Sequence, residues 1–189
     1  MRAIAILVFA LLFMTAADAG MAAETKTGTP KVLVAYFSWS GNTREIAKSI
    51  HRRVGGDLFE IVPSTPYPTD YSACLDQSAN ELKRQYRPPL KTHVANMKQY
   101  DVIFLGYPNW WATIPMPVAA FLEEYDFSGK TLVPFCSHGG GRLGQSVSAI
   151  AKLCPRATIL EVLSIHYGGG PTLQSDITTW LRKIGIRER

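Results

Sequence analysis

Short apolar runs alternate with segments of helical periodicity along most of the chain, and this alternation limits the possible folds to a few. The apolar runs span residues 32–37, 58–62, 102–105, 132–136 and 158–163. They are rich in Val, Leu, Ile and Phe with little polar alternation, as is typical of strands buried on both faces of a parallel sheet. We therefore predict a doubly wound α/β fold with five parallel strands and helices on both faces.

The longest connection between two predicted strands covers residues 63–100 and is rich in Pro at both ends. Its apolar stripe predicts one helix and consists of Leu75, Ala79, Leu82 and Tyr86. Every strand-to-helix loop of such a fold lies at one edge of the sheet, where ligands bind beyond the carboxyl ends of the strands. The loops after the first, third and fourth strands are therefore the candidate site.

Composition and charge narrow the class of protein further. The chain has 189 residues, of which 47% are hydrophobic and 19% charged, which excludes a disordered or fibrous protein. A net charge of +5 is far below that of a nucleic-acid-binding arm, so we expect no nucleic acid partner. Three cysteines exclude a disulfide-stapled fold, although a Cys74–Cys136 pair stays open. No His, Cys and Asp cluster has metal-binding spacing, so no metal is predicted.

The N-terminus has the pattern of a secretory signal peptide. A basic start is followed by an apolar run at 3–14 and an Ala-x-Ala pattern at 17–19. The run of about 12 residues is shorter than the ~20 that span a membrane. We predict a signal peptide at 1–19, a leader at 20–30 and one domain at 31–189, exported to the periplasm or secreted, with no stable membrane insertion after cleavage. An uncleaved anchor stays possible, and translation from Met21 would leave the protein in the cytoplasm.

The loop after the first predicted strand has the composition of an anion site. It consists of Ser38, Trp39, Ser40, Gly41, Asn42 and Thr43. Backbone N–H groups at the start of a helix, together with hydroxyls, favour a phosphate group. The loop has no Lys and no nucleoside-triphosphate motif. The alternative is an ordinary capping box formed by Asn42 and Glu45.

This Ser-x-Ser-Gly-Asn-Thr segment resembles the flavin-phosphate loop of the flavodoxin family, and the resemblance extends from about Lys31 to the C-terminus. The chain is more similar to a flavodoxin-like branch with a Trp-rich loop after the third strand and a Ser-His-Gly-Gly loop after the fourth. The resemblance implies a five-stranded sheet in the order 2-1-3-4-5, of the short-chain type, and non-covalently bound FMN.

The loop after the third strand contains Pro108, Asn109, Trp110 and Trp111. By resemblance this loop embraces the flavin, with Pro108 and Asn109 presenting backbone groups to the ring edge. A Trp ring stacks well on a flat isoalloxazine ring. We expect one of the two Trp rings to lie near the flavin and the other to pack down, without assigning which.

The loop after the fourth strand contains Ser137, His138, Gly139, Gly140 and Gly141. By resemblance its amides touch the pyrimidine edge of the flavin. Flavodoxins usually place a Tyr here, so the present residues predict a more open ring face, with His138 as a candidate for tuning the flavin. Tyr167, after the fifth strand, is expected to border the site.

Glycines in the same loop leave a second interpretation open. The G-x-G-x-x-G match at Gly139, Gly141 and Gly144, with Glu161 as a ribose ligand, would suit a dinucleotide. That motif belongs in the first βαβ unit, where this chain has its other phosphate loop.

Basic residues surround the predicted site, at Arg44, Lys48, Arg52 and Arg53 on the first helix and at Arg142. Positive charge stabilises a reduced, anionic flavin. We therefore expect a higher reduction potential than in acidic flavodoxins.

Three functions fit these observations. The first is an FMN-binding electron carrier that docks on a redox partner protein. The second is an FMN-dependent NAD(P)H or quinone oxidoreductase, and the third is a non-redox binding module. In the first two the flavin is the redox centre, so no catalytic side chain is assigned. The sequence leaves the oligomeric state open.

Overall fold

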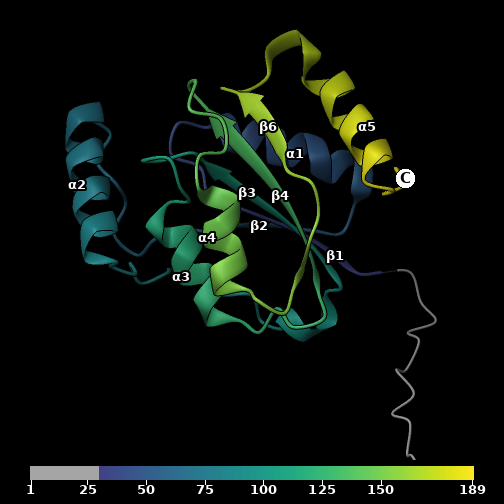
Figure 1. Ribbon diagram of the computed structural model, residues 1–189, viewed down its shortest axis with the longest axis horizontal. Coiled ribbons are helices and arrows are strands. Elements are labelled where there is room, and N and C mark those ends of the chain that lie inside the picture. The colour runs from purple at the N-terminus through teal and green to yellow at the C-terminus, as the bar shows by residue number, and fades with distance from the viewer. Residues whose placement is uncertain (1–29) are drawn as a thin grey trace, which may run out of the picture.

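The computed structural model describes residues 30–189, so the predicted signal peptide and nearly all of the leader lie outside the described residues. A parallel sheet runs in the order β2-β1-β3-β4-β5, with β6 also paired to β4 (Figure 1). This confirms the predicted order 2-1-3-4-5. The strands are β1 (Val32–Tyr36), β2 (Asp57–Glu60), β3 (Val102–Pro108), β4 (Thr131–His138), β5 (Thr158–Ile159) and β6 (Leu163–His166).

Helices cover both faces of the sheet (Figure 1). They are α1 (Asn42–Val54), α2 (Tyr71–Arg84), α3 (Met116–Glu124), α4 (Ser146–Leu153) and α5 (Leu173–Lys183), with short 3-10 turns η1 (Met97–Gln99) and η2 (Gly170–Thr172). Successive side chains of a strand point to opposite faces. In β1, Leu33 and Ala35 join the core under α3 and α4, whereas Val34 and Tyr36 join the core under α1 and α5. No helix within residues 30–189 is long and apolar enough to cross a membrane.

Helix α2 differs from the sequence prediction. Figure 1 shows it at one side of the molecule, beyond α3. Its buried residues are Cys74, Ser78 and Glu81, and not the predicted stripe, in which Tyr86 is exposed and lies past the end of the helix. A helix that packed on the sheet would bury its apolar stripe. The buried face of α2 combines Cys74 and Leu82, which pack at the hydrophobic core, with Ser78 and Glu81, which accept hydrogen bonds from aromatic side chains outside the helix.

The fifth predicted strand, 158–163, is interrupted and extends further than expected. Strands β5 and β6 both pair with β4, and residues 160–162 belong to neither strand, although the N–H of Leu160 still donates to the carbonyl of Leu132 at 2.9 Å. Between the two strands, the carbonyl of Glu161 accepts a hydrogen bond from Trp180 Nε1 of α5, at 2.8 Å.

Strands β3 and β4 also run further than the apolar runs indicated. Their pairing continues to Pro108 opposite Ser137, and β4 ends at His138. The first residues of the two predicted loops are therefore fixed in the sheet, because polar and Pro residues at a strand end still take part in parallel pairing.

Candidate functional site

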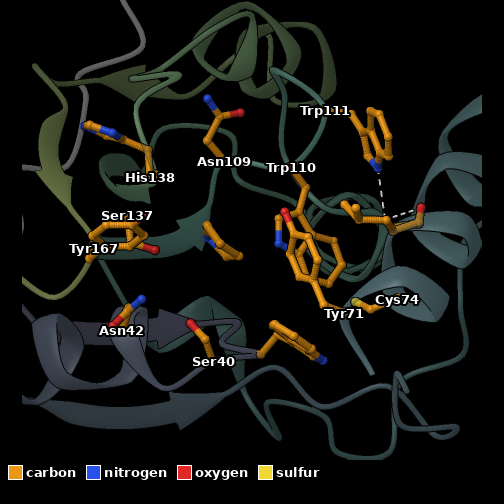
Figure 2. A pocket seen from close by; sticks show the side chains of 15 residues that line it. Ser40, Asn42, Tyr71, Cys74, Asn109, Trp110, Trp111, Ser137, His138 and Tyr167 are labelled. Atoms are coloured by element: carbon orange, nitrogen blue, oxygen red, sulfur yellow. Dashed lines mark hydrogen bonds between the residues drawn. The ribbon is translucent and has the colours of Figure 1, made fainter. Parts of the chain in front are cut away.

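The carboxyl ends of the central strands border a cavity of about 530 Å³ (Figure 2). All three predicted loops reach it, through Trp39, Ser40, Asn42, Pro108, Asn109, Trp110, Trp111, Ser137, His138 and Gly139. The predicted residues Ser38, Gly41, Thr43, Gly140 and Gly141 lie in the same loops but do not line the cavity. The sequence prediction missed the wall formed by α2, which contributes Tyr71, Cys74, Leu75 and Ser78. Tyr167 borders the site as expected.

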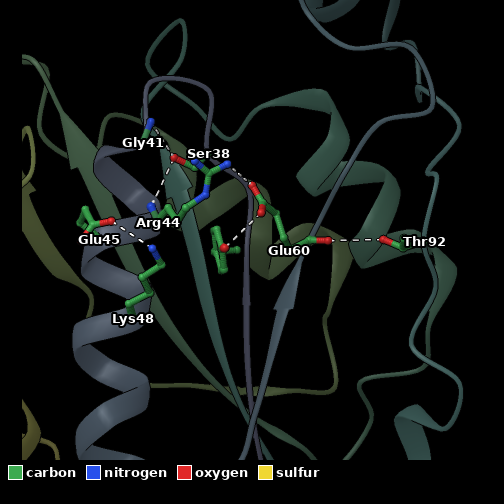
Figure 3. Close-up of polar contacts among 8 residues, drawn as sticks. Ser38, Gly41, Arg44, Glu45, Lys48, Glu60 and Thr92 are labelled. Atoms are coloured by element: carbon green, nitrogen blue, oxygen red, sulfur yellow. Dashed lines mark hydrogen bonds and ion pairs between the residues drawn. The ribbon is translucent and has the colours of Figure 1, made fainter.

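The loop before α1 leaves amide groups unengaged beside the cavity. Ser38 Oγ accepts hydrogen bonds from the backbone N–H of Gly41 and of Arg44, at 3.2 and 3.3 Å (Figure 3). Within residues 30–189 no hydrogen bond engages the amides of Ser40 and Asn42. Unsatisfied N–H groups at a helix N-terminus form a ready anion site.

Gly41 determines the start of α1. It is the N-cap residue, with φ of 93°, and it makes no side-chain cap. Asn42 is thus the first helical residue, so the alternative capping box of Asn42 and Glu45 is wrong. The left-handed backbone at this position explains the glycine, since other residues rarely adopt such a φ.

The two adjacent indole rings have different environments. Trp110 packs edge-on against Phe37 and Tyr67, with ring centroids 5.3 and 5.1 Å away. Trp111 is half-exposed, and its Nε1 donates to Ser78 Oγ of α2 at 2.9 Å (Figure 2). Trp110 is therefore the packed ring of the pair, although it also lines the cavity.

Backbone strain concentrates around the cavity. Residues other than glycine with left-handed φ occur in all three loops that follow β3, β4 and β6: Trp111 (52°), Ala112 (58°), Arg142 (49°) and Tyr167 (49°). Each such residue costs about 1–3 kcal/mol and persists only where neighbours hold it. The carbonyl of Ala112 is held by the N–H of Gln145 at 2.6 Å, and a Cβ on Gly144 would collide with that carbonyl. A glycine at position 144 therefore allows the two loops to approach each other this closely.

Asn109 carries an unpaired acceptor. Its Nδ2 donates to the carbonyl of Arg142 at 2.6 Å, which fixes the orientation of the amide. Its Oδ1 is buried and has no hydrogen-bond partner within residues 30–189. A buried acceptor without a donor costs about 1–3 kcal/mol, so this atom is suited to a ligand N–H or hydroxyl.

His138 lies at the end of β4, opposite His166 of β6. Its Nδ1 accepts the N–H of Gly140 at 3.1 Å, so a neutral ring carries its proton on Nε2. Burial lowers the pKa of His138, and the neighbouring His166 and Arg142 lower it further. His138 therefore favours the neutral form.

Comparison with known proteins agrees with this geometry. A sequence model of the family described as Flavodoxin matches residues 31–184. The chain belongs to the flavodoxin family. A search of curated proteins gives no match.

Solved structures with the same fold come from several bacteria. A candidate flavoprotein from Bacteroides eggerthii DSM 20697 is 34% identical, with a TM-score of 0.74, covering 84% of this chain and 100% of its own. One from Bacteroides uniformis ATCC 8492 is 28% identical, with a TM-score of 0.73, covering 82% and 99%. A flavoprotein in complex with FMN from Lactobacillus acidophilus NCFM is 19% identical, with a TM-score of 0.64, covering 80% and 99%, which shows the shared fold.

Three of the basic residues expected near the site are paired with carboxylates. Arg44 contacts Glu60 at 2.6 Å (Figure 3), Lys48 contacts Glu45 at 3.3 Å, and Arg53 contacts Glu188 at 3.4 Å. None of the charged residues within 30–189 lines the cavity. Arg52 instead donates to Ser49 Oγ, and the charge of Arg142 acts on His138 of the same loop. The higher reduction potential expected from these cations stays a prediction.

Two other hypotheses from the sequence lack structural support. Glu161, the candidate ribose ligand, pairs with Lys183 of α5 at 2.6 Å, away from the glycine loop. Cys74 and Cys136 are both buried and free, so the pair left open by the sequence does not form. Burial raises the pKa of Cys136 to about 12, which keeps this thiol protonated at neutral pH.

Proposed function

We propose that this flavodoxin-family protein is an FMN-dependent redox protein that transfers electrons through non-covalently bound flavin. One observation carries the proposal. Ser40 and Asn42, whose amides are unengaged, line the same cavity as Trp110 and as Asn109, whose buried Oδ1 is unpaired. A phosphate site next to an aromatic cavity suits a phosphorylated flat cofactor.

The chemical groups of the cavity match the parts of FMN. The amides of Ser40 and Asn42 would hold the phosphate, and Asn109 Oδ1 would accept a hydrogen bond from an N–H of the ring. Trp110 and Tyr167 would supply apolar surface at the ring. When bound, FMN supplies one- or two-electron chemistry. The FMN complex of the Lactobacillus acidophilus relative supports this assignment.

Two further expectations belong to the proposal. The pattern of residues 1–19 supports export to the periplasm or secretion, so that FMN would be acquired after folding there. The electron partner would be a redox protein or a small quinone-like molecule.

The second function, an FMN-dependent oxidoreductase, is favoured by the extension of the cavity beyond the loops to α2. Outside the cytoplasm its reductant would be a donor other than NAD(P)H.

Potentiometry on the FMN-loaded protein tests the proposal. We expect the bound flavin to be reduced and reoxidised reversibly, and the reduced protein to pass electrons to cytochrome c or to 2-methyl-1,4-naphthoquinone. Transfer to the protein acceptor alone would favour a carrier, and turnover of the quinone would favour an oxidoreductase. Bound flavin that neither acceptor can reoxidise would contradict both and leave a non-redox binding module.

A further inference from the structure

The indole ring of Trp110 is held differently from the other indole rings of the chain. The indole N–H groups of Trp39, Trp111 and Trp180 each donate a hydrogen bond. That of Trp110 has no hydrogen-bond partner within residues 30–189. The backbone of Trp110 is fixed by two hydrogen bonds with Thr113, at 3.1 and 2.9 Å. The ring itself is therefore held by the side chains that pack against it.

Two aromatic rings pack edge-on against Trp110. The rings of Phe37 and Tyr67 lie 5.3 and 5.1 Å from it, at interplanar angles of 88° and 82°. The energy of such contacts depends on the angle between the rings, so a movement of either ring would change the position of Trp110. The sheet fixes Phe37, whose N–H donates to the carbonyl of Gly106 in β3 at 2.9 Å. Tyr67 lies in the irregular segment before α2 and needs another anchor.

Glu81 of α2 is that anchor. The Tyr67 hydroxyl donates to Oε2 of Glu81, and Gln77 Nε2 donates to its Oε1 at 2.9 Å. Tyr67 and Glu81 are both buried, with 8% of each side chain exposed. Burial raises the pKa of Tyr67 and the bond to Glu81 raises it further, so the phenol keeps its proton and stays the donor. Glu81 thus fixes the tip of the Tyr67 ring.

Packing alone does not account for the buried carboxylate. Within residues 30–189 no basic side chain forms an ion pair with Glu81. Burial of a carboxylate without a cation costs free energy, and Phe with Leu would fill these two positions without a polar group to satisfy. A fully satisfied polar network makes its members rigid, whereas apolar contacts leave a ring free to tilt. The hydrogen bond therefore contributes direction.

We propose that Glu81 is a positioning residue for the ligand of the cavity. Through the Tyr67 hydroxyl it holds the Trp110 ring at the angle at which a flat ligand meets it. Glu81 does not line the cavity, whereas Trp110 does. A side chain that is ordered in advance loses less entropy on binding. This inference rests on the proposed function, because the flat ligand is the ring system that FMN would place beside Trp110.

A double variant separates positioning from stability. Tyr67→Phe alone leaves Oε2 of Glu81 without its donor and should destabilise the protein in urea. Tyr67→Phe/Glu81→Leu removes both partners and keeps apolar volume, so its stability should return close to that of wild type. We expect the Kd of FMN to stay raised about two- to tenfold in the double variant, which is the effect of ordering one side chain on binding. Glu81→Gln keeps an acceptor for the Tyr67 hydroxyl, and its Kd should stay within about twofold of wild type.

A second measurement reports on the ring without flavin. Protein labelled with fluorotryptophan gives one fluorine NMR resonance for each Trp, and Trp110→Phe assigns that of Trp110. In the flavin-free double variant this resonance should shift or broaden, whereas that of Trp180, in the core on the other face of the sheet, stays in place. The matched control is Tyr100→Phe, which removes a Tyr–carboxylate bond to Asp57 of 2.6 Å outside the cavity. It should change neither the Trp110 resonance nor the Kd of FMN.

Any of three results overturns the inference. They are a Trp110 resonance equal in wild type and double variant, an FMN affinity that recovers together with the stability, and an equally large effect of Tyr100→Phe. If wild type does not bind FMN, the proposed function fails, while the flavin-free spectra still decide whether Glu81 positions Trp110. If the double variant does not fold, Glu81→Leu carries the same expectation for the Trp110 resonance, since it leaves only an uncharged hydroxyl without its partner.

Discussion

The side-chain hydroxyls of Thr43 and Ser137 lie 2.7 Å apart, and both residues are buried. Their hydrogen bond joins the first turn of α1 to the carboxyl end of β4, across 94 residues of sequence. It fixes the loop before α1 against the strand that carries His138. Two walls of the cavity are therefore held in register by one pair of hydroxyls.

Replacement of Ser137 by Ala should destabilise the protein. The change leaves the Thr43 hydroxyl buried without its partner, which costs about 1–3 kcal/mol. Urea unfolding measures the difference. The matched control is Ser148→Ala, because Ser148 is exposed and its hydroxyl bonds only within its own turn. We expect the control to stay within about 0.5 kcal/mol of wild type. Equal stabilities of the two variants would show that the Thr43–Ser137 bond contributes nothing.

Replacement of Gly41 by Ala should weaken FMN binding. A Cβ at this position meets no atom within 4 Å, but φ is 93°. An L-residue pays about 1–2 kcal/mol for a left-handed backbone, which corresponds to about 5- to 30-fold in affinity if the loop relaxes. Flavin fluorescence titration gives the Kd. Gly129→Ala is the control, since Gly129 also has a positive φ and open space but lies outside the cavity. Equal FMN affinity in both variants would contradict a role for the Gly41 turn.

Replacement of Asn109 by Ala should separate binding from stability. In the flavin-free protein the change removes one hydrogen bond to Arg142 and also an unsatisfied acceptor, so stability changes by no more than about 1 kcal/mol. In the FMN complex it removes the expected acceptor for a ring N–H, and the Kd should rise about tenfold. Asn80→Ala on the exposed side of α2 is the control. A Kd equal to wild type would show that Asn109 Oδ1 does not meet the flavin.

The features that the sequence could predict are those set by residues close together in the chain. Apolar runs and glycines predict the strands and the three loops, because these signals are local, whereas the order of the strands was implied by the resemblance to flavodoxins. The role of α2 was not predictable from its apolar stripe, since Ser78 and Glu81 are buried by partners from distant segments. The pairing of Arg44 with Glu60 was hidden for the same reason. The available signal was the spacing of Ser78 and Glu81, which are three residues apart and therefore lie on one face of the helix.

The pH dependence of stability should carry a contribution from His138. Its folded pKa is lower than its unfolded value, first through burial and then through His166 and Arg142. The unfolded state therefore binds a proton more readily, so this contribution is complete above the unfolded pKa of about 6.5 and is lost as the pH falls through the folded pKa. His138→Asn keeps an acceptor for the N–H of Gly140 and removes the titration. Urea midpoints at pH 7.5 and 5.5 should differ less in the variant. An identical difference in wild type and variant would contradict the shift.

The most direct test of the account compares FMN with riboflavin, which lacks the phosphate. Purified protein is titrated with each flavin, desalted, and measured by its visible absorption. The account predicts one retained FMN per chain and a riboflavin affinity at least about 100-fold lower, because the amides of Ser40 and Asn42 would donate charge-assisted hydrogen bonds to the phosphate. Retention of no flavin, or equal affinity for both, would contradict the assignment of this cavity to FMN.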